Sequence, residues 1–100
     1  MLNLASNNIE EKGLKVLCEA LASNQIKVRD LNLSANFLHF NGCKHLVDAL
    51  IENQTLRKLA INSNFIKCEG AECLSFMLGL ETCLIEEIDI SDNFIQNRGA

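Results

Sequence analysis

The sequence predicts an α/β repeat protein, in which short parallel strands in one layer alternate with helices in another. Hydrophobic residues first occupy alternate positions, as in Leu31 and Leu33, and then the wider intervals of Leu46 and Leu50. The first spacing is typical of a strand with one buried face, and the second is typical of an amphipathic helix. The same change of spacing begins at three further places, which are Leu2, Leu59 and Ile88.

Two further residue types keep the period of this pattern. Asparagines separated by 29, 28 and 29 residues stand at Asn7, Asn36, Asn64 and Asn93, and glycines at the same intervals stand at Gly13, Gly42, Gly70 and Gly99. Two independent markers with one period make chance recurrence a poor explanation. We therefore expect repeats at residues 2–30, 31–58 and 59–87, and a partial repeat at residues 88–100.

The first element of each repeat is expected to be a strand. Leu31 and Leu33 in one repeat, like Leu59 and Ile61 in the next, would point inward while their neighbours face solvent. Because each copy would align with the one before it, the strands should pair as a parallel sheet.

The second element of each repeat is expected to be a helix packed on the back of that sheet. Apolar residues recur there at helical spacing, at Leu17, Ala20 and Leu21, at Leu46, Ala49 and Leu50, and at Leu74, Met77 and Leu78. The chain has no proline, so each helix can run unbroken. We expect the repeated glycine to provide a tight backbone entry into the helix.

The repeated asparagine stands where the chain leaves the strand. Its amide both donates and accepts hydrogen bonds, so it can satisfy backbone groups that the turn would otherwise leave unpaired. We interpret Asn7, Asn36, Asn64 and Asn93 as a structural ladder that connects the repeats.

These stretches resemble a known family. VRDLNLSANFL (residues 28–38), LRKLAINSNFI (56–66) and IEEIDISDNFI (85–95) fit the pattern L-x-x-L-x-L-x-x-N, and their spacing is similar to that of the ribonuclease-inhibitor type of leucine-rich repeat protein. The resemblance implies a right-handed solenoid, or horseshoe, with its parallel sheet on the concave face and its helices on the convex face. The ribonuclease inhibitor alternates asparagine with cysteine at the ladder position, whereas all four positions here are asparagine, so its function need not carry over.

Neither end of the chain resembles the atypical terminal unit that caps a repeat array. Internal repeats offer an apolar edge to their neighbours. We therefore expect this chain to be part of a longer solenoid, or its ends to be covered by a partner.

The expected concave face would be formed by the residues that flank the strand hydrophobes. These are Asn3, Ala5, Asp30, Asn32, Ser34, Lys58, Ala60, Asn62, Glu87, Asp89 and Ser91. They are small, polar and mixed in charge, which favours binding of another protein. Three phenylalanines that follow ladder asparagines, Phe37, Phe65 and Phe94, could anchor a partner along the rim or could stack to shield the turns between repeats.

The sequence indicates no catalytic, metal or cofactor site. Cys68 and Cys73, or His39 with Cys43 and His45, lack a recognisable zinc spacing, and neither histidine has an evident acidic orienter. A net charge of −4 argues against nucleic acid or anionic membrane as partner, and five cysteines without a paired pattern favour an intracellular, cytoplasmic setting. We expect a protein that is not an enzyme.

Four functions remain open. The leading interpretation is a protein interaction scaffold. Similar repeats also occur in Ran GTPase-activating proteins, although no residue of the loops here matches a catalytic role. LNLSANFL, INSNFI and LIENQTLRKL are similar to tropomodulin-type actin-capping repeats, and related arrays occur in ciliary assemblies. The sensor arrays of nucleotide-binding innate immune receptors use repeats of the same type.

Overall fold

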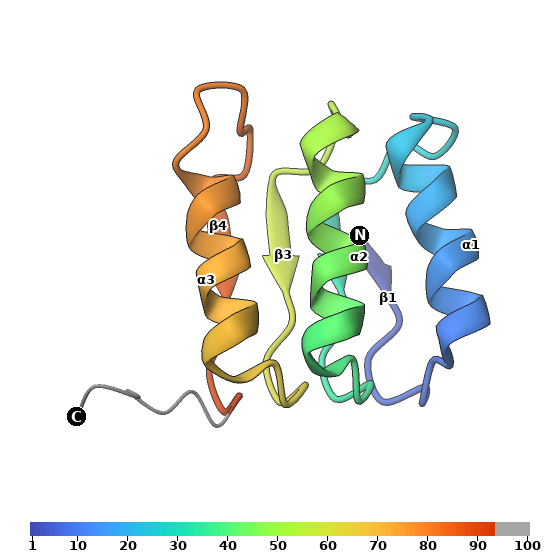
Figure 1. The fold of residues 1–100 in the computed structure, drawn as a ribbon. Helices are drawn as coiled ribbons and strands as arrows, with labels where there is room; N and C mark the ends of the chain where they lie inside the picture. Colours follow the sequence, from blue (N-terminus) through green and yellow to red (C-terminus); the bar gives the residue numbers. More distant parts are fainter. Residues whose placement is uncertain (94–100) are drawn as a thin grey trace.

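The computed structural model describes residues 1–93, which form strands and helices in strict alternation (Figure 1). The strands are β1 (Leu2–Asn3), β2 (Asp30–Asn32), β3 (Lys58–Ala60) and β4 (Glu87–Asp89), and the helices are α1 (Glu11–Ala22), α2 (His39–Glu52) and α3 (Lys67–Leu78). The strands form one sheet in the order β1-β2-β3-β4, and the helices lie side by side against one of its faces. The predicted α/β architecture with a parallel sheet is confirmed. None of the helices within residues 1–93 has the length and apolarity needed to cross a membrane.

The strands pair in the register that the hydrophobic pattern predicts. Leu31 lies opposite both Leu2 and Leu59, and Leu59 in turn lies opposite Ile88. Backbone hydrogen bonds continue one residue beyond the assigned strands, because the Leu33 N–H donates to the Ala60 carbonyl at 2.8 Å. Successive repeats therefore place equivalent residues side by side.

The core lies between the sheet and the helices. The strands contribute Leu31, Leu33, Leu59 and Ile61, and α2, which packs between α1 and α3, contributes an unbroken buried stripe that includes Leu46. Both Leu33 and Leu46 are fully buried, as their two different spacings predict.

The prediction was wrong for Leu78 on α3. Its equivalents in the two preceding repeats, Leu21 and Leu50, are 0% and 7% exposed, whereas Leu78 is 40% exposed. The helices that carry Leu21 and Leu50, α1 and α2, each pack against the helix of the next repeat. Within residues 1–93 no helix follows α3, which accounts for the greater exposure of Leu78.

The repeated glycines do not have the predicted turning role. None of the described glycines has a positive φ, and Gly42 and Gly70 lie within α2 and α3. A Cβ at Gly70 would lie 2.7 Å from Ile66 Cβ, and one at Gly42 would lie 3.0 Å from Leu38 Cβ. These glycines therefore permit close packing at the start of each helix.

The turning is done by residues with side chains. Ala35, Phe37 and His39 have φ angles of 57°, and the equivalent residues of the next repeat are Ser63, Phe65 and Lys67, with φ angles of 57° to 59°. A left-handed backbone is costly for residues other than glycine, at roughly 1–2 kcal/mol each. The hydrogen bonds of the loops must therefore hold this conformation.

A buried asparagine outside the predicted ladder connects the repeats at their other end. Asn53, just after α2, is 7% exposed, and its amide nitrogen donates to the Leu21 carbonyl at 2.9 Å. Its amide oxygen accepts from the N–H groups of Thr55 at 3.0 Å and Leu56 at 2.7 Å. A periodic signal for this role was present but missed, because Asn24 stands 29 residues before Asn53, and its side-chain oxygen accepts from the Gln54 N–H at 2.9 Å.

Candidate functional site

The strand side chains that point away from the helices form one surface, which we call the sheet face. Along each strand, outward residues flank an inward hydrophobe, so Asp30 and Asn32 flank the buried Leu31. The sheet face carries the predicted binding residues of all four strands, which are Asn3, Asp30, Asn32, Lys58, Ala60, Glu87 and Asp89. The parallel register thus gathers residues that are a full repeat apart in sequence.

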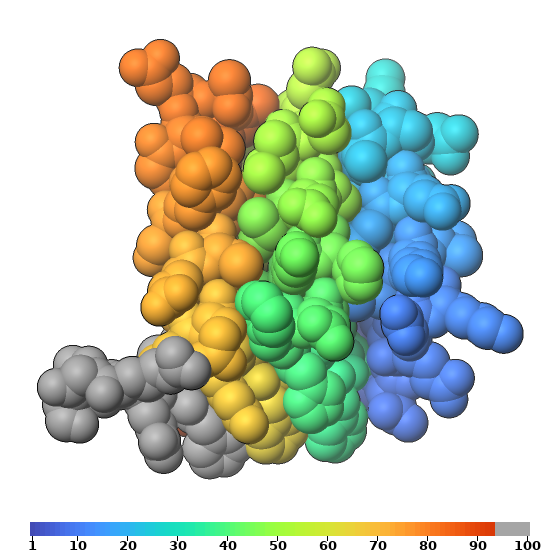
Figure 2. Space-filling view, in the orientation of Figure 1, coloured from blue at the N-terminus to red at the C-terminus, as the bar shows by residue number. Residues whose placement is uncertain are grey.

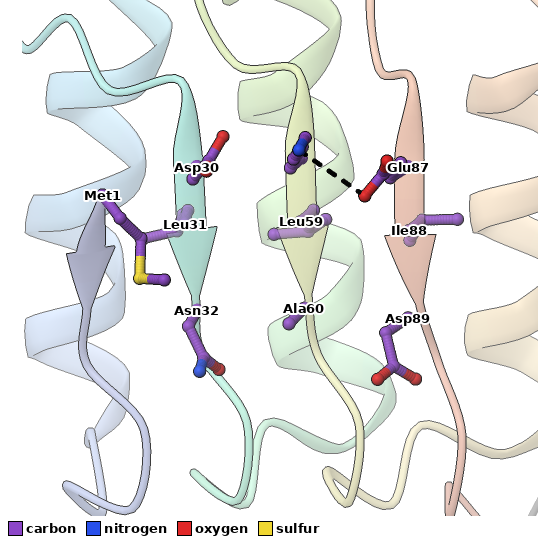
Figure 3. Close-up of a pocket in the computed structure, with 10 residues that line it drawn as sticks. Met1, Asp30, Leu31, Asn32, Leu59, Ala60, Glu87, Ile88 and Asp89 are labelled. Atoms are coloured by element: carbon purple, nitrogen blue, oxygen red, sulfur yellow. Dashed lines mark ion pairs between the residues drawn. The ribbon is translucent and has the colours of Figure 1, made fainter.

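Charged side chains form one row across the sheet face. Lys58 lies opposite Asp30 on one side and Glu87 on the other, and its ammonium nitrogen is 3.9 Å from Glu87 Oε2 (Figure 3). Both members of this ion pair are at least half exposed, so the pair contributes little to stability. The two carboxylates against one ammonium leave this row acidic.

A hollow spans the charged row and a second row beside it, since Asp30, Lys58 and Glu87 also line it. Asn32, Ala60 and Asp89 lie opposite one another on β2, β3 and β4, and Ala60 has by far the shortest side chain of the three (Figure 3). The hollow has a volume of about 260 Å³. Met1 also lines it, which the sequence reading missed because Met1 precedes the repeat pattern.

The polar side chains at the strand ends also fold back on their own loops. The side-chain oxygens of Asn3, Asn32 and Asp89 each accept, at 3.0 Å, from the backbone N–H two residues further on. Hydrogen bonds from the Ser91 N–H, and then from its hydroxyl, hold the pKa of the Asp89 carboxyl below its usual range. Asp89 is therefore a fixed negative charge at neutral pH.

The third repeat breaks this pattern. Ala60 cannot accept such a bond, and Asn62, two residues further on, instead accepts a hydrogen bond from the Ser34 hydroxyl of the preceding repeat. Three predicted binding residues, Ser34, Asn62 and Ser91, thus lie in loops. Their side chains form hydrogen bonds to other side chains of the same molecule.

The ladder asparagines lie just behind the sheet face, between the ends of adjacent strands. Asn36, Asn64 and Asn93 are at most 2% exposed, whereas Asn7 is exposed. The side-chain oxygen of Asn64 accepts from the Asn36 N–H at 2.8 Å, and that of Asn93 accepts from the Asn64 N–H at 2.7 Å. Each amide nitrogen donates to carbonyls of its own repeat and of the preceding one. Asn36, Asn64 and Asn93 are therefore structural groups and are not accessible to a partner.

Two of the three rim phenylalanines are in contact. The ring centroids of Phe37 and Phe65 are 5.7 Å apart with an interplanar angle of 11°, and the His39 ring stacks on Phe65 at 5.7 Å. Phe94 lies outside the described residues. Phe37 remains 56% exposed although its backbone is left-handed. An exposed aromatic ring in a costly backbone conformation fits a rim anchor, while the stacking fits the shielding role, so both interpretations keep support.

Replacing Phe37 with asparagine is expected to change the free energy of unfolding by less than about 1 kcal/mol. Asn8 occupies the equivalent position of the first repeat with a φ of 48°, so asparagine tolerates this backbone. Relief of left-handed strain, roughly 1–2 kcal/mol, should offset the lost ring stacking of about 0.5–1.5 kcal/mol. Urea unfolding measures the difference, and a loss above about 2 kcal/mol would show that Phe37 is needed for packing.

The thiols of Cys18 and of the metal candidate Cys43 are buried. Burial, together with the nearby Cys73 thiol, raises the pKa of Cys43 to about 12, and burial together with Asp48 raises the pKa of Cys18 to about 11. Both thiols are therefore protonated at neutral pH, and neither supplies a thiolate nucleophile. No group of three or more metal-ligating side chains occurs in the part of the chain that the structure describes.

Comparison with known proteins places this arrangement in a family context. A model described as Leucine Rich repeat matches residues 2–18 and 52–75. Similar curated proteins include NACHT, LRR and PYD domains-containing protein 4C of Mus musculus, which is 32% identical over 89% of this chain, and protein 9B of the same organism, which is 32% identical over 97%. Protein 13 of Homo sapiens is 32% identical over 90% of the chain. The chain spans only 9% to 10% of the length of these relatives.

Proposed function

The chain is a leucine-rich repeat protein, and from this premise we propose that its sheet face binds another protein. The observation that carries this proposal is the hollow over Ala60, which polar and charged side chains of neighbouring strands surround. At about 260 Å³ it is smaller than typical small-molecule pockets of roughly 300–1,000 Å³. A hollow of this size suits a single side chain from a partner protein.

The partner segment should be basic. Asp30, Glu87 and Asp89 oppose one ammonium group, that of Lys58, on the sheet face. Complementary charge speeds association and suppresses wrong partners more than it raises affinity. We infer that an arginine or lysine of the partner lies over the carboxylates while a neighbouring side chain enters the hollow.

We further propose that the repeats are of the ribonuclease-inhibitor type and continue as a right-handed solenoid. The pairing of Leu2, Leu31, Leu59 and Ile88 in one register, at intervals of 29, 28 and 29 residues, supports this subtype. In such a horseshoe the sheet face would be the concave face. The repeats 2–30, 31–58 and 59–87 would then be one segment of a longer array.

Among the four candidate settings, the relatives favour the sensor array of an innate immune receptor. Their names combine a leucine-rich repeat with NACHT and PYD domains, and the chain spans about a tenth of each. The general role as an interaction scaffold is compatible with this setting. No specific observation favours GTPase activation or cytoskeletal capping. We infer a binding role without catalysis, in an intracellular setting that the five free cysteines support.

Site-specific photocrosslinking tests this function. A photoreactive phenylalanine analogue at position 3, an exposed position of the sheet face beside the hollow, should crosslink to a partner through a basic segment. Mass spectrometry of the adduct identifies that segment. Ala60→Arg, which fills the hollow and adds a positive charge beside the expected cationic segment, should abolish co-purification of the crosslinked partner.

Position 16 provides the matched control. Val16 is 67% exposed on α1, in the helix layer, so an analogue there should not form the same adduct and Val16→Arg should leave co-purification unchanged. Circular dichroism should be the same for all variants. Identical adducts at positions 3 and 16, or a partner held equally well by Ala60→Arg, would contradict binding at the sheet face.

A further inference from the structure

The helix layer contains a second surface that the sequence patterns do not mark. A groove of about 390 Å³ runs along the outer side of α2 and α3, on the opposite face of the molecule from the sheet face. In Figure 2 it lies between the green and orange ridges. Its apolar lining comes from Phe40, Val47 and Ile51 on α2 and from Cys73 and Phe76 on α3.

Val47 and Cys73 of this lining pack in or against the core, whereas Phe40, Ile51 and Phe76 do not and are not needed to pack one repeat on the next. The corresponding positions between α1 and α2 carry polar or small residues, because Phe40 replaces Glu11, Ile51 replaces Ala22, and Phe76 replaces Asp48. The two helix pairs nevertheless pack in the same way. Phe76 is 65% exposed and Ile51 is 37% exposed. Contiguous apolar side chains that a fold does not require indicate an interaction surface.

The charges around the groove are mostly negative. Asp48, Glu69 and Glu72 line it together with a single cation, Lys44. Glu69 and Glu72 on α3 stand at the positions that Asn41 and Lys44 occupy on α2. The α3 wall therefore has two carboxylates where α2 has one amide and one ammonium group. An occupant with basic side chains on either side of an apolar stripe would complement this arrangement.

The groove also selects the shape of its occupant. Both walls are helices, whose backbone N–H and C=O groups are bonded internally, so no free strand edge is available for an extended peptide. From Phe40 to Ile51 the groove runs about 16 Å, which equals about three turns of a bound helix. A helix with apolar residues at positions i, i+4 and i+7 can lay its stripe along such a groove.

We propose that the α2–α3 groove is a docking site for a basic amphipathic helix of another protein. The apolar stripe of that helix packs on Phe40, Ile51 and Phe76, and its lysines or arginines lie over Glu72 and Asp48. The site is independent of the sheet face, so one segment of the chain can hold two partners on opposite sides.

Fluorescence anisotropy tests the proposal with a designed probe. The probe is a labelled peptide of about four helical turns, with leucines along one stripe and lysines on either side. It should bind the chain saturably, whereas a scrambled peptide of equal composition, which has no stripe, and a glutamate version of the same helix should not. Equal binding of the scrambled peptide would overturn the proposal, because it would reduce the interaction to charge alone.

Two variants locate the binding. Phe76→Asp installs the residue that α2 carries at the equivalent position, and it should weaken peptide binding about tenfold or more. Glu72→Lys should weaken binding of the lysine peptide and strengthen binding of the glutamate version. Val16→Asp, at the exposed α1 site equivalent to Cys73, is the control and should change affinity less than about twofold.

Thiol footprinting gives an independent readout. Bound peptide should slow alkylation of Cys73, which lines the groove, and should leave alkylation of Cys83, which does not line it, unchanged. Unaltered affinity in both Phe76→Asp and Glu72→Lys would overturn the proposal. So would a chain that fails to bind the peptide and instead forms a dimer that Phe76→Asp abolishes, because the occupant would then be a second copy.

Discussion

Replacing Asn64 with leucine is expected to lower the free energy of unfolding by about 3 kcal/mol or more. The Asn64 side-chain oxygen accepts from the N–H groups of Asn36 at 2.8 Å and Leu38 at 3.3 Å, and its nitrogen donates to the carbonyls of Leu33 and Ile61, both at 2.9 Å. Leucine fills a similar volume but leaves these buried groups without partners. Urea unfolding followed by circular dichroism measures the loss.

The first repeat supplies the matched control for this prediction. Asn7 is exposed, and within residues 1–93 its side chain makes one weak hydrogen bond, to the Ala5 carbonyl at 3.3 Å. Asn7→Leu should therefore cost less than about 1 kcal/mol. Equal losses in the two variants would mean that the asparagine side chains do not connect the repeats energetically.

Replacing Leu46 with alanine is expected to cost about 2 to 5 kcal/mol. Leu46 is fully buried on α2, which packs against both α1 and α3 (Figure 1). The lost methyl groups would leave a cavity. The helices around it are held by their own neighbours, so they cannot move to fill it. The shift of the urea midpoint at constant slope measures the cost.

Val16→Ala controls for the general effect of truncating an aliphatic side chain on a helix. Val16 is 67% exposed, so its truncation should change stability by less than about 0.5 kcal/mol. If Leu46→Ala falls within the same range, the stripe on α2 is not the packed face that its spacing indicates.

The sequence was sufficient for the parts of the fold that depend on periodicity. Leu31 and Leu59 lie in one register because their spacing repeats, and Leu46 is buried because it belongs to a helical stripe. The left-handed conformation of Phe37 was not predictable, since a bulky aromatic residue is among the least expected at such a position. The role of the glycines was misread because the left-handed turn is made by residues with side chains. The small size of the glycines instead allows close contact with Leu38 and Ile66.

The sequence also indicated which residues flank the strand hydrophobes, and those within the strands lie on one surface, whereas Ser34, Asn62 and Ser91 lie in the loops that follow. The hollow was not predictable, because it arises from the shortness of Ala60 relative to Asn32 and Asp89, and that comparison requires the register of three strands. The groove on the helix layer could not be predicted without the positions of two helices. Phe76 and Ile51 are far apart in sequence, and only the packing of α3 against α2 brings them to one surface.

The asparagine ladder also gives the chain a direction along which it can grow. The side-chain oxygens of Asn36, Asn64 and Asn93 each accept from the backbone N–H of the ladder asparagine one repeat earlier. Every junction therefore uses the same donor and acceptor. A gene duplication that inserts one whole unit between Asn36 and Asn64 restores the same bonds on both sides, whereas an insertion of half a unit does not. Length can thus vary during evolution in whole repeats without any new interaction.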